Sequence, residues 1–373
     1  MSRTKKRLLS WTLLVAMVLT LLPVSQPAMA AQTAESIRFP SDVASYEAEC
    51  PACQKTVTWK PYNGENSNTD NPLTASSTST HFHLYLTQDQ VYDAGSYFLV
   101  VYRNMCFNLN GYSITASEGS KAAFACARVA NFLDTYGGSI VTGYSGSAGA
   151  GSAIHANSTT GDYRLYGGTW TKLSADTASA IVRFSGKGAT ITLYDGAVID
   201  ATGKTSAEDI GSAVTVGGGL TTAGAVQKAT FTIAGGEIKG GTLVAGVTGS
   251  PNCAFLNILG GKVTSNVIVN ETAKLTLSGA PIVSGNVTLA QGVQANITGL
   301  TKNASIRMEG YASGMPLTEA REDAEVLQGV FTAGNQGEIL LGSDNVFYSF
   351  SAGMAIVHTD GKADLYPTAE QAV

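Results

Sequence analysis

One short phrase, built around a pair of small residues, recurs through the middle of the chain. An aliphatic residue is followed by any residue, by Gly or Asp, by a small residue, by any residue, and then by an aliphatic or aromatic residue. The seven copies are LNGYSI (109–114), TYGGSI (135–140), LYGGTW (165–170), LYDGAV (193–198), IAGGEI (233–238), ILGGKV (258–263) and LSGAPI (277–282). Their starts lie 26, 30, 28, 40, 25 and 19 residues apart. Self-similarity at this spacing indicates that the chain stacks similar structural units.

Each copy predicts a strand that ends in a bend. TITLYDG and ATFTIAGG alternate apolar and polar residues before the small pair, as a half-buried strand does, and Gly-Gly permits a positive φ. A second class of short strand lies between the copies: AFACARVA, SAIHAN, SAIVRFSG, SAVTVGG and TLVAGVT. Between residues 100 and 300, no stretch long enough to form a helix shows a convincing 3.6-residue periodicity of apolar residues. The pattern therefore predicts an all-β fold with two or three short strands in each repeat.

Two architectures can bury the apolar faces of such strands. They can form an antiparallel sandwich or barrel, or they can coil so that each turn stacks on the last. The repeated bend favours the coil, because a Greek-key protein does not need the same bend seven times; the sandwich remains the alternative. In the coil, equivalent aliphatic residues stack along the axis, and Trp170 lies at an inward position. The predicted stack contains Leu109, Leu165, Leu193, Ile233, Ile258 and Leu277.

The run CFNLNGYSIT, followed by the L-x-G-G-x-I units, resembles the secreted right-handed parallel β-helix proteins, the pectate-lyase-like superfamily in its loosest sense. It resembles especially the surface proteins of Gram-positive anaerobic bacteria that carry a short cysteine-containing segment before the helix. The resemblance implies a solenoid over residues 96–300, with an N-terminal cap at 31–95 and a C-terminal cap at 301–373. Members include lyases, hydrolases, adhesins and inert stalks, so the architecture does not name an activity.

The two ends of the chain differ from the repeats. Residues 1–30 predict a secretory signal peptide, with basic residues, the apolar run WTLLVAMVLTLL and small residues at Ala28 and Ala30. The alternative, a retained membrane anchor, fits less well because a span needs about 20 apolar residues. Near the other end, TEAREDAEVLQG predicts one or two helical turns, and VFYSFSAGMAIVHTDGKADLY predicts a hairpin turning at 359–361. We expect an extracellular protein without a transmembrane segment after cleavage.

The charge of the mature chain bears on its partners. Cleavage removes four basic residues and no acidic one, which changes the formal net charge from −5 to −9. A surface of this sign repels nucleic acid and anionic lipid. We therefore expect no nucleic-acid partner.

The N-terminal segment contains a candidate zinc site. CPAC supplies Cys50 and Cys53, and HFHLYL supplies His81 and His83, which project to the same side of a strand. Two thiolates and two imidazoles complete a tetrahedral zinc site. The alternative is oxidised cysteines, as in many secreted proteins. In that case Cys50 pairs with Cys53 and Cys106 with Cys126, while Cys253 is left alone, because five cysteines cannot all pair within one chain.

A catalytic site has weaker support in the sequence. Lyases of the resembled superfamily use calcium-binding carboxylates with a basic residue, and hydrolases use paired carboxylates. The best candidates are Asp195, Asp200 and Arg183. Glu237 and Lys262 occupy equivalent positions in successive phrases, which predicts an ion pair between neighbouring repeats rather than an acid/base couple.

Three tyrosines suggest a surface that binds sugars. Tyr136, Tyr166 and Tyr194 follow the first aliphatic residue in consecutive phrases, so alternation turns them outward. Stacked on adjacent turns, they would form an aromatic strip that suits the apolar faces of sugar rings. The alternative is a ladder of tyrosines that only stiffens the sheet.

The leading functional expectation is therefore a non-catalytic, secreted or cell-surface module that binds polysaccharide or another surface and requires no cofactor. A polysaccharide lyase or glycoside hydrolase acting on acidic polysaccharide, with calcium for a lyase, is the first alternative. A structural stalk of a surface protein is the second.

Overall fold

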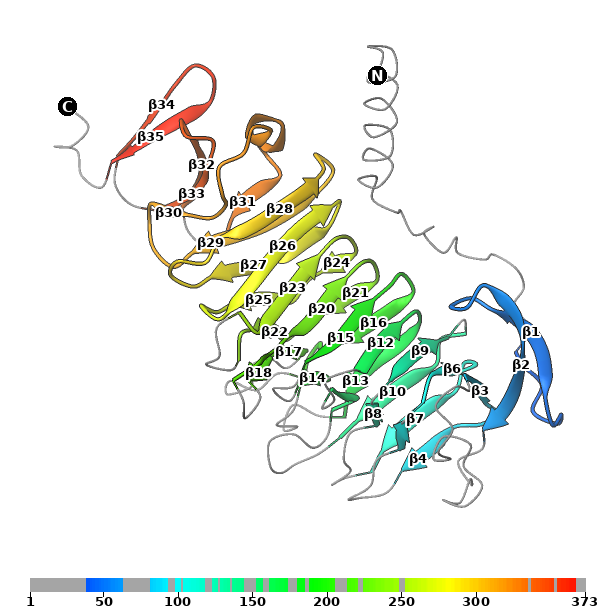
Figure 1. Ribbon diagram of the computed structural model, residues 1–373. Coiled ribbons are helices and arrows are strands. Elements are labelled where there is room, and N and C mark those ends of the chain that lie inside the picture. The colour runs from blue at the N-terminus through cyan, green and yellow to red at the C-terminus, as the bar shows by residue number, and fades with distance from the viewer. Residues whose placement is uncertain are drawn as a thin grey trace, which may run out of the picture. The chain divides into compact units, whose positions relative to one another are not determined.

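Nearly all regular structure in the described residues is β-strand, and most strands pair in parallel with strands one repeat away (Figure 1). The computed structural model describes residues 38–62, 81–92, 98–101, 103–117, 123–126, 128–134, 136–143, 152–156, 161–173, 180–184, 188–204, 213–220, 224–247, 252–334, 337–351 and 354–366. The predicted signal peptide lies outside these ranges. Within them, no helix has both the length and the hydrophobicity needed to cross a bilayer.

The first sheet has eleven strands, and only its β1–β2 hairpin is antiparallel. Each later strand pairs in register with the equivalent strand of the next repeat. In order across the sheet, the strands are β1 (Tyr46–Cys50), β2 (Lys55–Tyr62), β3 (Phe82–Leu86), β6 (Met105–Asn108), β9 (Val129–Leu133), β12 (Gly161–Leu165), β15 (Ala189–Leu193), β20 (Ala229–Ile233), β23 (Ala254–Ile258), β26 (Ala273–Gly279) and β28 (Ala295–Leu300).

The second sheet has seventeen strands, all paired in parallel, and takes two strands from most repeats. One series is β4 (Gln90–Tyr92), β7 (Ser113–Ala116), β10 (Ser139–Thr142), β13 (Gly168–Lys172), β16 (Ala197–Asp200), β21 (Glu237–Lys239), β24 (Lys262–Val263), β27 (Ile282–Leu289), β29 (Ser305–Gly310) and β31 (Phe331–Ala333). The other series is β5 (Leu99–Val101), β8 (Phe124–Cys126), β11 (Ile154–Ala156), β14 (Val182–Phe184), β17 (Val214–Val216), β22 (Thr242–Ala245) and β25 (Asn266–Val269), which ends on the second half of β27.

The core consists of rows of apolar residues that repeat across the strands. One buried row of the first sheet contains Phe107, Phe132, Leu165, Leu193, Ile233, Ile258, Leu277 and Ile297. A second row, which includes Trp170, runs through the second sheet. Burial of each such side chain stabilises the fold by about 1.5–3 kcal/mol. Parallel rows of this kind contradict the antiparallel sandwich and confirm the all-β prediction.

The phrase aligns the repeats correctly only from the third copy onward. Phe107 and Phe132 occupy the row in the first two repeats, so the prediction that Leu109 belongs to it is wrong, although Leu109 is fully buried. The reason is bend length. Seven positions separate Phe132 from Ser139, whereas four separate their partners Leu165 and Thr169. The longer bend shifts the phrase relative to the strand.

The C-terminal residues form a separate five-stranded sheet. Its strands, in order, are β30 (Met315–Pro316), β33 (Phe347–Phe350), β32 (Glu338–Gly342), β35 (Lys362–Tyr366) and β34 (Met354–Val357). The predicted helical turn is the 3-10 helix η1 (Ala324–Leu327), and the predicted hairpin is β34–β35, with Gly361 at φ +81° in its turn. A two-stranded sheet, β18 (Gly219–Leu220) with β19 (Val226–Gln227), completes the structure.

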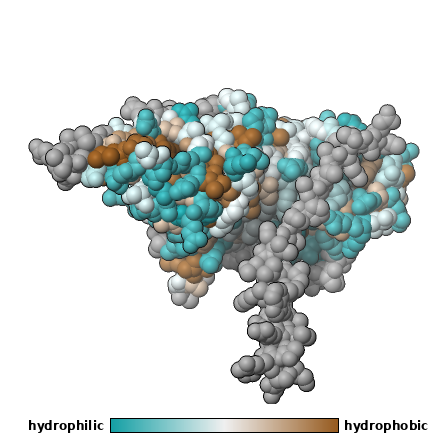
Figure 2. Space-filling model, turned by 90° about the horizontal axis from the view of Figure 1, so that it is seen from above, coloured by the Kyte–Doolittle hydropathy of each residue, from teal (hydrophilic) through white to brown (hydrophobic). Residues whose placement is uncertain are grey.

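The parallel pairing extends beyond residues 96–300 at both ends, from β2–β3 to β29–β31. The surface seen in Figure 2 is a mosaic of hydrophilic and hydrophobic residues. Single exposed hydrophobic side chains such as Val91, Tyr311 and Val326 are ordinary on a folded surface and indicate no partner by themselves.

Candidate metal centre

The candidate metal centre begins at the turn of the β1–β2 hairpin. Cys50 ends β1 and pairs with Lys55, and the turn between them contains Cys53. The backbone N–H groups of Cys53 and Gln54 donate to the Cys50 carbonyl at 3.1 and 2.7 Å, and Gln54 adopts a positive φ of 55°. This tight turn carries the two thiols at one end of the hairpin.

The hairpin packs over the outer face of the first three strands that follow it. From β12 onward the outward residues of the first sheet are partly exposed, whereas in β3, β6 and β9 most of them are buried. Trp59 of the hairpin is fully buried in one cluster with Tyr85, Cys106 and Leu133. The outer face is therefore dry here, and a polar group on it needs a partner.

Four ligand atoms from this covered face and the hairpin turn converge. The thiol sulfurs of Cys50, Cys53 and Cys106 and a ring nitrogen of His83 all lie within 4.8 Å of one another. Strand register explains part of the convergence, because His83 of β3 and Cys106 of β6 are direct neighbours in the parallel pairing. Cys50, Cys106 and His83 are buried, and Cys53 is partly exposed.

The spacing suits a tetrahedral ion. Zinc–sulfur bonds of about 2.3 Å and zinc–nitrogen bonds of about 2.0–2.1 Å place tetrahedral ligand atoms about 3.5–3.8 Å apart. The Cys53 sulfur lies 3.5 Å from the Cys106 sulfur and 3.4 Å from His83 Nε2. Three thiols and one imidazole are soft donors of the kind that bind zinc. Four protein ligands leave no open position, as in structural rather than catalytic zinc sites.

His81 lies beside the four rather than among them. Its Nε2 is 3.2 Å from the Cys106 sulfur and 3.9 Å from the Cys53 sulfur, and its ring stacks on His83 at 4.7 Å. Both rings project from the same side of β3, as the alternation of the strand predicts. With its proton on Nε2, His81 donates to the Cys106 sulfur. The CPAC and HFHLYL motifs predict His81 as the fourth ligand, whereas Cys106 takes that place in the converging set.

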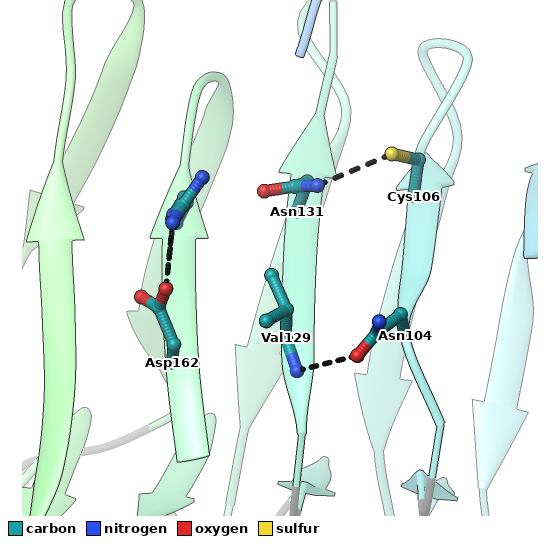
Figure 3. Close-up of polar contacts among 6 residues, drawn as sticks. Asn104, Cys106, Val129, Asn131 and Asp162 are labelled. Atoms are coloured by element: carbon teal, nitrogen blue, oxygen red, sulfur yellow. Dashed lines mark hydrogen bonds and ion pairs between the residues drawn. The ribbon is translucent and has the colours of Figure 1, made fainter. Parts of the chain in front are cut away.

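Asn131 supports the cluster from the next strand. It is the neighbour of Cys106 in the register of β6 with β9, and its Nδ2 donates to the Cys106 sulfur at 3.3 Å (Figure 3). Only 3% of Asn131 is exposed, and its Oδ1 has no hydrogen-bond partner in this part of the chain. An amide that donates to a ligand sulfur stabilises the thiolate and orients it, as outer-shell partners of metal ligands do.

The three thiols differ in acidity. Hydrogen bonding from Cys106, with smaller contributions from His83 and Cys53, lowers the pKa of Cys50 to about 4 despite its burial. The pKa of Cys106 is raised because it is the donor to that thiolate, and burial raises the pKa of Cys53. Without metal, the cluster therefore holds one thiolate and two thiols at neutral pH.

The segment before the hairpin is fastened to the same region. Phe39 exchanges two backbone hydrogen bonds with the side chain of Asn110, at 2.8 and 3.2 Å, and packs its ring edge-on against Tyr85. Tyr85 Oη donates to the carbonyl of Pro40 at 2.7 Å. The hairpin and this segment together cover the beginning of the first sheet.

The alternative prediction, in which Cys106 forms a disulfide with Cys126, is wrong. Cys106 lies in the first sheet and Cys126 in the second, and the pairing partners of β6 are β3 and β9. The side chains of Cys50, Cys53, Cys106 and Cys253 carry free thiols. The local Cys50–Cys53 disulfide is therefore also absent from these residues. An alignment of FHLY (82–85) with MCFN (105–108) would have placed Cys106 beside His83.

Two of the three predicted tyrosines stack. Tyr166 and Tyr194 lie 4.5 Å apart with their rings 7° from parallel. Tyr136 does not continue the stack, because the long bend after β9 leaves Leu133 as the residue before Tyr166 in this row. Tyr166 also packs against the buried cluster at the hairpin, and burial raises its pKa to about 12.

The predicted catalytic residues do not form a cluster, and two of them accept hydrogen bonds from backbone N–H groups. Asp195 Oδ1 accepts from the Gly236 N–H of the next repeat at 3.1 Å, and Asp200 Oδ1 accepts from the Thr202 N–H at 2.9 Å. Arg183 lies beside His155 in the register of β11 with β14. Among the described residues, no hydrogen bond or ion pair joins any two of Asp195, Asp200 and Arg183. The predicted Glu237–Lys262 ion pair is confirmed at 3.0 Å.

Comparisons of this chain with models of known protein families, with curated proteins and with solved structures found no match.

Proposed function

We propose that the chain is a right-handed parallel β-helix whose N-terminal hairpin is held in place by one zinc ion, and that it acts outside the cell as a non-catalytic module. The closed set of three thiols and one imidazole carries this proposal. A zinc ion with four protein ligands has no position for substrate, so its contribution is to folding. The hairpin needs such a contribution, because only its last three residues pair with β3.

The handedness and the coil are supported by the repeat pattern. Each repeat supplies one strand to the first sheet and up to two to the second, and the equivalent strands pair in parallel. Parallel strands joined by crossovers are right-handed in nearly all proteins. A secreted origin rests on the predicted signal peptide in residues 1–30.

Metal analysis tests the zinc. Purified protein lacking residues 1–30 is expected to contain one zinc per chain by elemental mass spectrometry. Cys106→Ser should lose it, because one of three thiolate ligands is removed. Cys253→Ser is the matched control, since the Cys253 thiol is also buried but donates to the Gly219 carbonyl at 3.3 Å, far from the cluster in sequence. Equal zinc in both variants would remove the proposal.

A second proposed function, contact with glycans, rests on the tyrosine stack. Tyr194 is its last ring, because the next residue in the row is Ala234, which is exposed. The row continues to Leu259, which is 36% exposed. Strands lie about 4.8 Å apart, so Tyr194 and Leu259 flank a space about two strand spacings wide. One sugar ring stacked on Tyr194 above Ala234 fits this space.

Retention on a glycan array tests this contact. Tyr194→Ala should abolish retention of glycans that bind the wild-type chain. Tyr136→Ala is the control, because Tyr136 is partly buried like Tyr194 but lies outside the row. Loss of retention in both variants, or in neither, would show that the tyrosine stack is not the contact. Saccharides, rather than nucleic acid or anionic lipid, fit the net charge of −9 after signal cleavage.

A further inference from the structure

The C-terminal sheet carries a cavity that is remote in sequence from the metal centre. It has a volume of about 610 Å³, within the range of about 300–1,000 Å³ typical of small-molecule sites. Strands β32, β33 and β35 supply most of its lining, and Ser313 and Gly314, just before β30, complete it. The cavity therefore spans three neighbouring strands of one sheet and the segment that leads into a fourth, β30.

Aromatic rings supply the apolar part of the lining. Tyr348, Phe350 and Tyr366 all line the cavity and are all partly exposed. Tyr348 lies against Gly342: a Cβ there would come within 2.8 Å of the Tyr348 ring and 2.5 Å of Asp344 Oδ1. A glycine at position 342 thus keeps the floor of the cavity open and lets the ring lie close to the backbone.

Two carboxylates supply the polar part, and both accept hydrogen bonds from neighbouring groups. Asp344 accepts from Tyr348 Oη at 2.7 Å and from the Val346 N–H at 3.2 Å. Asp364 accepts from Ser343 Oγ at 2.7 Å and contacts His358 Nε2 at 2.9 Å. Each oxygen retains a further lone pair, because a carboxylate can accept about four hydrogen bonds.

No Lys or Arg stands among the lining residues that the structure describes. The adjacent Lys362 pairs with Glu325 at 2.8 Å. The charge of the Lys362 ammonium group is therefore balanced by Glu325 of η1. The negative faces of the aromatic rings and the two carboxylates therefore give the cavity a negative potential with few donors.

We propose that this cavity binds an organic ammonium ion, a positively charged nitrogen on an apolar body. The rings attract such a cation through their faces while covering its carbon atoms, and the carboxylates of Asp344 and Asp364 balance its charge. A neutral sugar fits less well, because sugar hydroxyls need donors as well as acceptors. An anionic ligand is repelled.

Choline and its uncharged isostere 3,3-dimethylbutan-1-ol test the proposal, since the two differ only in a nitrogen that replaces a carbon. Isothermal titration calorimetry of the chain without residues 1–30 is expected to show saturable choline binding and at least tenfold weaker binding of the isostere. Asp344→Asn keeps the acceptor for Tyr348 and should weaken choline alone. Phe350→Leu, which keeps an apolar side chain, should also weaken choline more than the isostere.

Asp323→Asn is the matched control, because Asp323 is an acid outside the cavity that pairs with Arg321. Its choline affinity should equal that of the wild type. Equal affinities for choline and the isostere would mean that the cavity is merely apolar, and absence of saturable choline binding would mean that it holds no such cation. Either result overturns the proposal. An equal loss in Asp323→Asn would do so as well, since it would assign the effect to general surface charge.

Discussion

Replacement of Asn131 by leucine should weaken zinc binding without destabilising the metal-free fold, so it distinguishes the two contributions of this residue. The Asn131 amide donates one hydrogen bond, at 3.3 Å, to the Cys106 sulfur. Loss of an outer-shell partner typically lowers metal affinity 10–100-fold, which corresponds to about 1.4–2.7 kcal/mol. A hydrogen bond to a charged group contributes about 1.5–3 kcal/mol. The two magnitudes agree, so Asn131→Leu should bind zinc 10–100-fold more weakly.

The metal-free protein should respond differently. The Oδ1 atom of Asn131 is buried without a partner, and a buried unsatisfied acceptor costs about 1–3 kcal/mol. Leucine has a similar volume and removes that acceptor. We therefore expect Asn131→Leu to be no less stable than the wild type when both are stripped of metal.

Competition for zinc with a chromophoric chelator measures the affinity, and urea unfolding of the stripped proteins measures the stability. Asn257→Leu is the matched control. Asn257 occupies the same outward row on β23, and its Nδ2 donates to Thr232 Oγ1 rather than to a sulfur. A zinc affinity of Asn131→Leu within threefold of the wild type would refute the assigned hydrogen bond. A similar loss in Asn257→Leu would show that the row, not the sulfur contact, matters.

Three further predictions concern the cluster and the bends. Zinc binding at pH 7.4 should release about two protons, because Cys50, with a pKa of about 4, is already ionised and the other two thiols are not; calorimetry in buffers of different ionisation enthalpy counts them, and affinity should fall as the pH is lowered. His83→Ala should abolish stoichiometric zinc, whereas His81→Ala should keep one zinc per chain in elemental analysis; the reverse would make His81 the ligand. In urea unfolding, Asp134→Ala should lower the free energy of unfolding by about 3 kcal/mol and Asp195→Ala by about 1 kcal/mol. The reason is that Asp134 accepts hydrogen bonds from three backbone N–H groups and Asp195 from one. Equal losses in the two variants would contradict this.

The sequence predicts the architecture well where the phrase begins on the buried row itself. From LYGGTW to LSGAPI, only four or five positions separate the row residue from its counterpart in the second sheet, so Leu165 and Leu277 fall in one buried row as predicted. In the first two copies the bend is longer, and the first residue of the phrase no longer lies in the buried row of the strand. Tyr136 was misplaced for this reason. Register depends on bend length, which a short motif does not contain.

The residues of the candidate metal centre were predicted only in part, for a different reason. CPAC and HFHLYL are local signals, and they identify Cys50, Cys53 and His83. Cys106 carries no local signal, because its role follows from its position opposite His83 in the next strand. Asn131 is one strand farther again. Ligands that converge through parallel register are visible in sequence only after the repeats have been aligned correctly.

The location of the cluster follows from a general weakness of parallel sheets. The first strand of such a sheet has an open edge that can pair with other chains. Here β2 pairs with β3 through only Lys60, Pro61 and Tyr62 before the hairpin turns over the outer face. A short hairpin of this kind buries few residues and is only marginally stable by itself. In the proposed zinc site, ligands from both the hairpin and the sheet would join the two parts.

This arrangement predicts where the molecule opens first. When zinc is removed, amide hydrogen exchange should rise in β1 and the first half of β2, because Cys50 and Cys53 are then no longer joined through the metal to His83 and Cys106. The strands from β12 to β28 should keep their protection, since their pairing involves no metal ligand. Exchange that rises uniformly along the first sheet would instead mean that the hairpin and the repeats unfold as one unit, and that the ion stabilises the whole fold.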